Sequence, residues 1–221
     1  MNFKILIDPC AARAKERAER KVFSDPEIAT QLQIDEKTPI YLFSGGLVKH
    51  RGIENTILAL RHLKEGVLVL LGEGQLKDEL LALRSKEGLE RRVFFADFVH
   101  HLDVPQLISS ANAGIIPYEN VGINHYLCSP SKLFHYIMAE LPVACSNFPF
   151  LRKIVLENGL GSVFNPDDPE SIAQAITDLV KDSKKYSLIK ANLKVAKQKY
   201  CWEEEEKKFL SIYREICPIF S

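Results

Sequence analysis

The sequence predicts an α/β protein built on a Rossmann-like open parallel sheet of about six strands, with helices on both faces. Short apolar runs without polar alternation, such as 40–43, are typical of strands that are buried on both faces of a sheet. Each run is followed by a short loop and then by apolar residues at helical spacing. This repeated strand–loop–helix order favours right-handed crossovers between parallel strands.

Local signals mark the ends of several expected elements. Asp168-Pro169-Glu170 is a helix start, and Gly88 is well placed to end an earlier helix. In the last helix, Glu203 and Glu204 stand four residues ahead of Lys207 and Lys208, which favours exposed ion pairs. The strands are expected at 40–43, 67–71, 93–95, 114–117, 142–146 and 162–164, and the helices at 52–64, 75–86, 104–110, from 131, from 169, at 183–199 and at 202–216.

Residues 1–37 differ from the rest of the chain. They offer one brief strand candidate and two helix candidates, 11–21 with a thin apolar stripe and the short 24–33. We therefore expect 1–37 to be an inter-domain linker with a helical segment, and 38–221 to form the Rossmann-like domain with its C-terminal helices.

Composition narrows the class of protein. The chain has 221 residues, enough for one large domain, and its 46% hydrophobic and 26% charged residues are ordinary for a soluble fold. The 29 basic and 29 acidic residues balance, so nothing points to a nucleic-acid partner. The five scattered cysteines favour free thiols in a reducing compartment. With no apolar run long enough to span a bilayer and no signal-peptide pattern, the expected location is cytoplasmic.

The stretch 129–146 carries the strongest local signal. Pro130 fits a helix start, Ser129 can cap it, and we expect the helix to begin near Ser131. Apolar side chains lie on one face of this helix, whereas Lys132 and His135 are expected on the other. A helix N-terminus with a serine and a lysine is a ready anion site. An ordinary amphipathic helix explains the pattern equally well.

The same stretch carries a family resemblance. Its letters S-P-S-K-L-F-H-Y-I-M-A-E-L-P-V-A-C-S resemble the S-P-N-K-L-F-E-Y-M-A-A-G-x-P-V-V-A-S segment of retaining GT-B glycosyltransferases of family 4. In that family the segment holds the diphosphate and ribose of a nucleotide-sugar donor. The resemblance covers roughly 38–216, which corresponds only to the C-terminal, donor-binding half of a GT-B fold. It implies a nucleotide-sugar as ligand and an acceptor-binding half supplied by a missing N-terminal domain or a separate partner chain. Peripheral membrane association is expected only through that missing half.

A first candidate binding segment is the loop 44–52, in which Gly45 and Gly46 allow close backbone approach and Lys49 and Arg51 add positive charge. A tight turn with solvated basic residues is the simpler interpretation. The loop resembles the family's G-R-L-x-x-x-K-G, whose two cations grip the donor pyrophosphate. Gly46 stands at the arginine position and Arg51 at the lysine position. One cation is therefore absent, unless Lys49 or Lys132 replaces it.

Two further segments follow later strands. Gly72-Glu73-Gly74 resembles the family's G-x-G turn and does not form a dinucleotide fingerprint, although a simple turn is equally plausible. Phe98 and Val99 stand where the family holds the nucleobase by backbone contacts and packing, and Phe98 as a plain core residue is the alternative.

The fourth candidate segment is the helix start itself. The resemblance implies donor contacts from Ser129, Ser131 (usually Asn in the family) and the backbone of Leu133. It also places His135 where a family glutamate binds the ribose hydroxyls, and Leu127 at an earlier glutamate position. An imidazole offers one hydrogen bond to the ribose in place of two carboxylate acceptors, and an exposed histidine without a role is the alternative.

No metal site or cofactor is expected. His100, His101, His125 and Glu119 do not form a recognisable ligand set, and the resemblance implies metal-independent transfer with the nucleotide-sugar as substrate. Cys128 has no obvious base beside it and is expected to be a packing residue.

The leading hypothesis is therefore a glycosyltransferase donor domain. It would bind a UDP- or GDP-linked sugar and support retaining transfer of a hexose to an acceptor in polysaccharide biosynthesis. Arg51 and Lys132 are the predicted catalytic cations, which stabilise charge on the departing diphosphate together with helix N–H groups. The alternatives are a non-catalytic nucleotide-sugar-binding module with a decayed site, one subunit of a two-chain glycosyltransferase, or a purely structural domain.

Overall fold

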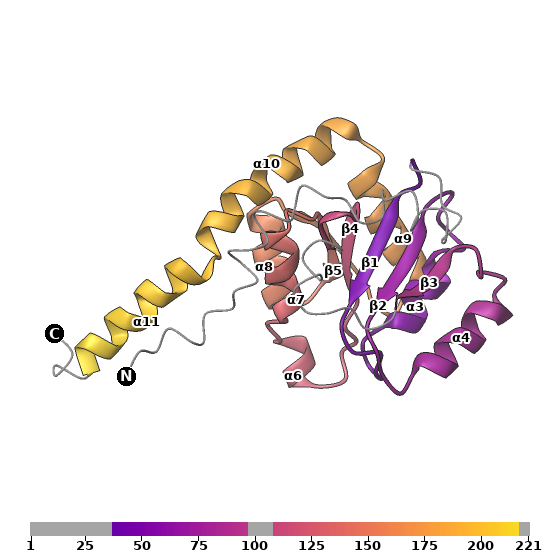
Figure 1. The fold of residues 1–221 in the computed structure, drawn as a ribbon, viewed down its shortest axis with the longest axis horizontal. Coiled ribbons are helices and arrows are strands. Elements are labelled where there is room, and N and C mark those ends of the chain that lie inside the picture. Colours follow the sequence, from indigo (N-terminus) through magenta and orange to yellow (C-terminus); the bar gives the residue numbers. More distant parts are fainter. Residues whose placement is uncertain (1–36, 97–107, 217–221) are drawn as a thin grey trace.

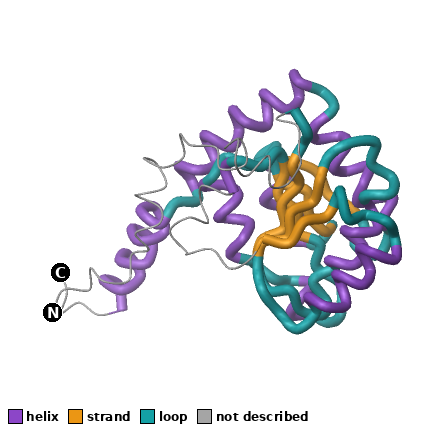
Figure 2. Tube along the Cα trace, turned by 45° about the vertical axis from the view of Figure 1, so that its right-hand side comes forward, coloured by secondary structure: helices purple, strands orange, loops and turns teal. Residues whose placement is uncertain are grey.

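The computed structural model describes residues 37–96 and 108–216, and it confirms the expected fold class (Figure 1). Six parallel strands form one sheet in the order β3-β2-β1-β4-β5-β6. Figure 2 shows this sheet at the centre of the main body, with helices around it. The strands are β1 (Ile40–Ser44), β2 (Val67–Leu71), β3 (Val93–Ala96), β4 (Ala113–Ile116), β5 (Val143–Ser146) and β6 (Gly161–Phe164).

The central strands are buried along their whole length because both faces of the sheet are covered. Every residue of β1, β2, β4 and β5 is buried. Each removes apolar surface from water at about 25 cal/mol per Å², and this burial is the main source of stability. The outer strand β6 is buried only at Phe164.

The helices fall into two groups, one on each face of the sheet. β1 to β3 progress in one direction and β4 to β6 in the other, so right-handed crossovers place α3 and α4 on one face and α7 and α8 on the opposite face. α9 packs beside α3, and α10 packs beside α7. The bounds are α3 (Ile53–Ala59), α4 (Lys77–Lys86), α6 (Ile123–Tyr126), α7 (Ser131–Met138), α8 (Pro149–Glu157), α9 (Pro169–Val180), α10 (Ser183–Lys199) and α11 (Trp202–Ile216).

Several helix ends behave as their local chemistry predicts. The Asp168 side chain accepts a hydrogen bond from the Glu170 N–H at 2.9 Å and so caps α9. Ile172, Ile176 and Leu179 form the buried face of that helix, as expected. Gly88 takes a positive φ of 66° directly after α4, in the left-handed region that ends many helices.

Other boundaries differ from the sequence prediction. α7 extends from Ser131 only to Met138, because Glu140 adopts a φ of +55° and breaks the helix before Pro142. The helices α6 and α8 were not predicted, although Pro149 at the start of α8 is an ordinary helix-start signal. Of the expected helix at 104–110 the structure describes only the end, and the helix candidates at 11–21 and 24–33 lie outside the described residues.

The chain closes with two long helices, whose bounds match the prediction. α11 leads away from the sheet and its covering helices (Figure 1). The predicted ion-pair register was wrong: Lys207 contacts Glu204 and Lys208 contacts Glu205, each three residues apart. All four side chains are solvent-exposed, so each pair contributes little to stability. In the part of the chain that the structure describes, no helix has the length and apolar character to cross a membrane.

Candidate functional site

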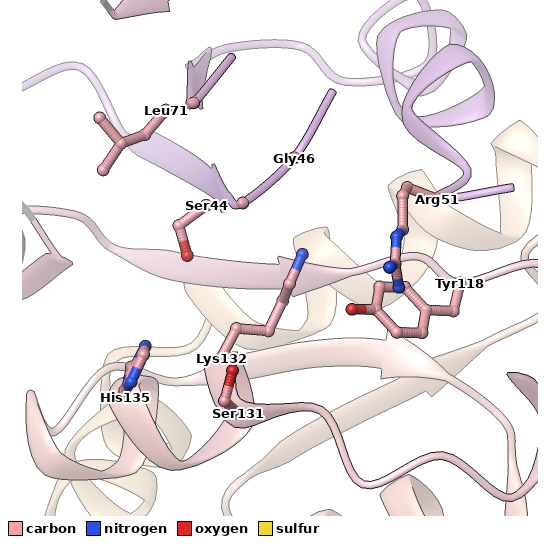
Figure 3. A pocket seen from close by; sticks show the side chains of 10 residues that line it. Ser44, Gly46, Arg51, Leu71, Tyr118, Ser131, Lys132 and His135 are labelled. Carbon is pink, nitrogen blue, oxygen red and sulfur yellow. The ribbon is translucent and has the colours of Figure 1, made fainter. Parts of the chain in front are cut away.

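A cavity of about 380 Å³ opens at the carboxyl ends of the central strands (Figure 3). This is the edge where the order of the strands reverses between β1 and β4, the usual ligand site of an open parallel sheet. The volume lies in the range of small-molecule sites. The cavity is lined by Ser44, Gly45, Gly46, Arg51, Leu71, Gly72, Tyr118, Ser131, Lys132 and His135.

Lys132 is the most unusual group in this cavity. It was expected on the exposed face of its helix, but only 7% of its surface is accessible. Its Nζ lies 3.9 Å from the ring centroid of Phe43 and 5.1 Å from that of Tyr118. Burial and then the neighbouring Arg51 charge lower the pKa of Lys132 to about 7. Aromatic faces attract the cation, but they do not replace its lost hydration, so an anionic ligand would restore the charged state.

Arg51 supplies the second positive charge. Its guanidinium lies 4.3 Å from the ring centroid of Tyr118, and the labelled side chains in Figure 3 show Arg51 and Lys132 approaching the same ring from two elements. No carboxylate is among the ten residues that line the cavity. The cavity therefore combines two cations with polar backbone and hydroxyl groups, a composition that suits an anion.

Glycines bring the β1 loop against the end of β2. Gly72 has a φ of 146°, and a Cβ at this position would lie 2.1 Å from the Gly45 carbonyl oxygen. The Gly45 N–H donates to the Leu71 carbonyl at 2.9 Å, and Leu47 N–H donates to Glu73 at the same distance. The walls of the cavity are thus fixed by backbone contacts.

The buried phenol of Tyr136 hydrogen-bonds to the end of β1, a role that was not predicted from the sequence. Its hydroxyl accepts from the Ser44 N–H at 3.1 Å and donates to the Leu42 carbonyl at 3.2 Å. The ring rests on Gly114, where an added Cβ would lie 2.5 Å from a ring carbon. Burial raises the pKa of Tyr136, so its hydroxyl stays protonated.

Comparison with known proteins identifies the family of this chain. The model of the family "Glycosyl transferases group 1" matches residues 24–195, more than half of the chain. The chain belongs to this glycosyltransferase family.

Individual relatives agree with this assignment. An uncharacterised glycosyltransferase of Methanocaldococcus jannaschii is 30% identical over 190 residues, which cover 83% of this chain and 46% of the relative. Sucrose-phosphate synthase from Thermosynechococcus elongatus has the same fold, with a TM-score of 0.72 at 23% identity over 85% of this chain and 48% of that one. Anabaena HepE in complex with UDP-glucose gives a TM-score of 0.63 at 19% identity, over 78% of this chain and 47% of that one. The chain spans about half the length of the relatives that it matches.

The structure brings together predicted residues from three separate segments of this glycosyltransferase domain. Gly45, Gly46 and Arg51 come from the β1 loop, and Gly72 comes from the β2 turn. Ser131, Lys132 and His135 come from α7. Ser131 and His135 are exposed and Lys132 lies deeper, so the α7 residues form one wall of the cavity.

Other predicted residues lie beside the cavity and support it. The Glu73 carboxylate contacts Lys77 at 3.0 Å, and Gly74 packs where a Cβ would lie 2.2 Å from the Leu47 carbonyl oxygen. The Leu133 side chain is fully buried, and its N–H already donates to Pro130 at 3.0 Å. Gly74 and Leu133 therefore support the site from behind its lining, whereas the Glu73 side chain is exposed.

The remaining predicted residues do not line the cavity. Ser129 and Lys49 are exposed at its flanks, and Pro130, not Ser129, occupies the N-cap of α7 without a side-chain hydrogen bond. Phe98 and Val99 lie outside the described residues, as do His100 and His101. Within the described ranges no three His, Cys, Asp or Glu side chains gather as metal ligands would, and burial raises the pKa of the half-buried Cys128 thiol.

Proposed function

We propose that this chain is the C-terminal, donor-binding half of a retaining family 4 glycosyltransferase, and that its cavity binds a UDP- or GDP-linked hexose. One observation carries the proposal: Arg51 and the buried Lys132 converge on a cavity without a lining carboxylate, at the switch point of the sheet. The family assignment and the fold shared with a UDP-glucose complex support it.

The two cations suit a diphosphate better than a single phosphate. Lys132 lies deep in the cavity and Arg51 lies nearer its rim, so two linked phosphate groups can each meet one positive charge. During transfer the bond from the sugar to the diphosphate breaks, and negative charge grows on the leaving group. Cations fixed before the reaction stabilise this charge without reorganising, which lowers the barrier. Because these side chains supply the positive charge, we expect transfer to need no metal.

The neighbouring groups suit the rest of the nucleotide. His135 stands one turn along α7 from Lys132 and lines the same cavity, within reach of a ribose bound beside the diphosphate. The Ser131 hydroxyl and the first N–H groups of α7 add neutral donors at the positive end of a helix. We assign binding of the acceptor in polysaccharide biosynthesis to the other half of the enzyme.

Binding without transfer is the second candidate, because two cavity positions depart from the family pattern. Gly46 contributes no charge where family members have an arginine, and His135 replaces a carboxylate. A site altered in this way can hold a nucleotide-sugar with too little stabilisation of the leaving group for turnover. The two candidates differ in turnover and not in donor affinity.

Calorimetric titration of the chain with UDP, GDP, ADP and their common sugar conjugates tests the proposal. We expect saturable binding of one nucleotide class, weakened about 10- to 100-fold in Lys132→Ala, as for loss of a charged hydrogen bond worth about 1.5–3 kcal/mol. Lys153→Ala is the matched control, because Lys153 is an exposed lysine on α8 away from the cavity. Binding that Lys132→Ala leaves unchanged would reject the proposed site.

A transfer assay separates the enzyme from the binding module. The chain joined to its acceptor-binding half is incubated with the preferred sugar-nucleotide and a mixture of glycan acceptors, and release of free nucleoside diphosphate is followed. Release that needs both the acceptor and Lys132 supports sugar transfer by an enzyme. Tight donor binding without any release favours the binding module.

A further inference from the structure

Two loops lie side by side next to the cavity, and each residue of one contacts a residue of the other. A Cβ on Gly52 would lie 1.8 Å from the Pro117 carbonyl oxygen, and the Arg51 guanidinium stacks over the Tyr118 ring. One residue further, the Glu119 N–H donates to the His50 carbonyl at 3.3 Å. The segments 50–52 and 117–119 therefore run antiparallel, with Arg51 in the middle of the matched stretch.

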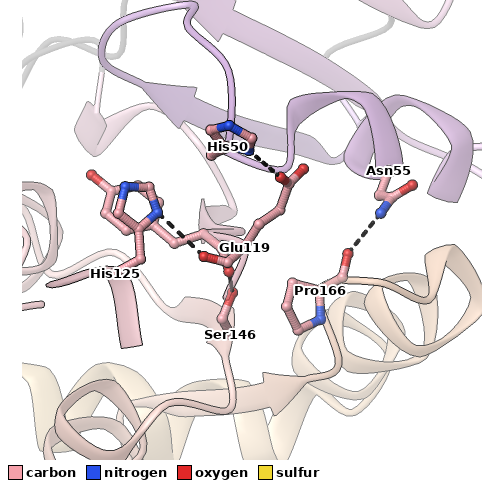
Figure 4. A network of polar contacts seen from close by, with 7 residues as sticks. His50, Asn55, Glu119, His125, Ser146 and Pro166 are labelled. Atoms are coloured by element: carbon pink, nitrogen blue, oxygen red, sulfur yellow. Dashed lines mark hydrogen bonds and ion pairs between the residues drawn. The ribbon is translucent and has the colours of Figure 1, made fainter. Parts of the chain in front are cut away.

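A side-chain contact closes the outer end of this stretch. His50 Nδ1 lies 3.1 Å from Glu119 Oε2, as the dashed line in Figure 4 shows. His50 also has a φ of +66°, in a region that few residues other than glycine adopt. Such a conformation persists where its surroundings hold it, and here the contacts to Glu119 do so.

The segment 117–119 is itself firmly anchored, so it can serve as a fixed support. The Ser146 hydroxyl lies 2.8 Å from the Tyr118 carbonyl and 3.3 Å from that of Ile116. His125 Nδ1 lies 3.2 Å from the Glu119 carbonyl. On the other loop, the Asn55 amide donates to Pro166 at 2.9 Å and ties down the start of α3 (Figure 4).

We propose that His50 and Glu119 are positioning residues that hold the Arg51 guanidinium over Tyr118 at the rim of the cavity. Their pairing fixes the backbone on one side of Arg51, and the close packing of Gly52 on Pro117 fixes it on the other side. The position of the guanidinium does not depend on a ligand. Its consequence for ligand affinity rests on the proposed function.

Because Glu119 is negatively charged, the direction in which its removal changes anion affinity tests its role. A carboxylate close to an anion site repels the anion, so its removal alone would strengthen anion binding. If Glu119 acts by positioning Arg51, Glu119→Ala weakens anion binding although a negative charge is lost. Glu119→Gln removes the same charge but keeps a side-chain oxygen that can bond to the imidazole.

The position of Arg51 can be measured in the free protein by the NMR signal of its Nε–H group, assigned by its loss in Arg51→Lys. Stacking over Tyr118 shifts this signal upfield, and Tyr118→Leu gives the position of the unstacked side chain. We expect His50→Ala and Glu119→Ala to move the signal toward that position, while Glu119→Gln preserves the wild-type shift. A wild-type shift in both alanine variants would overturn the proposal.

Titration with inorganic pyrophosphate measures the consequence. We expect Glu119→Ala to weaken binding about fivefold in the wild-type background, and not to weaken it when Arg51→Ala is already present, because only the loss of the negative charge then remains. Equal or tighter binding in Glu119→Ala would show that the pairing does not act on the anion site. If the wild-type protein binds no pyrophosphate, the proposed function fails, whereas the NMR signal still decides whether His50 and Glu119 position Arg51.

Discussion

Binding of a sugar-nucleotide at the cavity should be coupled to uptake of a proton by Lys132. Burial and Arg51 hold the pKa of this lysine at about 7 in the empty protein, so about one molecule in ten carries the charge at pH 8. A bound diphosphate favours the ammonium and raises its pKa. The complex is then protonated at both pH 6 and pH 8, and binding takes up about 0.9 proton at pH 8 but about 0.1 at pH 6.

The same linkage sets the expected change in affinity. Between pH 6 and pH 8 the dissociation constant should rise about tenfold, or about 1.4 kcal/mol, because the protonated fraction of the free protein falls by that factor. A sugar-nucleotide is a suitable probe, since each of its phosphates carries one ester and one anhydride link and neither titrates in this range. Calorimetry in two non-phosphate buffers of different ionisation enthalpy counts the protons directly.

Lys132→Met is the control for this experiment. Its remaining affinity should be weak and nearly independent of pH between 6 and 8. Zero proton uptake by the wild-type protein at pH 8 would refute the reasoning. So would a tenfold pH dependence that persists in Lys132→Met, since another group would then be responsible.

Three further predictions concern stability, measured by urea unfolding. Lys132→Met should stabilise the fold by about 1–4 kcal/mol at pH 7. The gain should shrink toward pH 10, because wild-type stability rises with pH between the lowered pKa of Lys132, about 7, and its unfolded value of 10.5. A loss of stability in Lys132→Met would contradict this reasoning. Gly72→Ala should cost about 1–3 kcal/mol more than Gly122→Ala, which has a similar φ but open space around it, and equal costs would remove the steric argument. Tyr136→Phe should cost about 1–3 kcal/mol by leaving the buried Ser44 N–H without its partner, while the exposed Tyr213→Phe should be neutral.

The parts of the fold that depend on local pattern could be predicted from the sequence. The apolar run 67–71 matches β2 residue for residue, and the helices 183–199 and 202–216 match α10 and α11, since each is defined by its own periodicity and caps. α8 was missed although its signals are present, with Pro149 at its start and Leu151, Ile154 and Val155 on one buried face.

The site was harder to predict because it depends on residues distant in the chain. Helical spacing placed Lys132 away from the core, but its Nζ lies against the Phe43 ring of β1 and the Tyr118 ring of the loop after β4. The support of Ser44 by Tyr136 joins residues 92 positions apart, and the room for that ring comes from the glycine at 114. Such contacts follow from packing of the sheet and have no local signature.

The position of the bound donor on the protein decides whether the cavity is the binding site. The chain, labelled with nitrogen-15, is titrated with the sugar-nucleotide that binds most tightly, and the backbone amide signals are followed. We expect the largest shifts at Gly45, Gly46, Gly72, Ser131 and Lys132, around the cavity at the switch point. Shifts concentrated instead at the exposed basic residues of α8, Arg152 and Lys153, would place the ligand elsewhere and contradict the account.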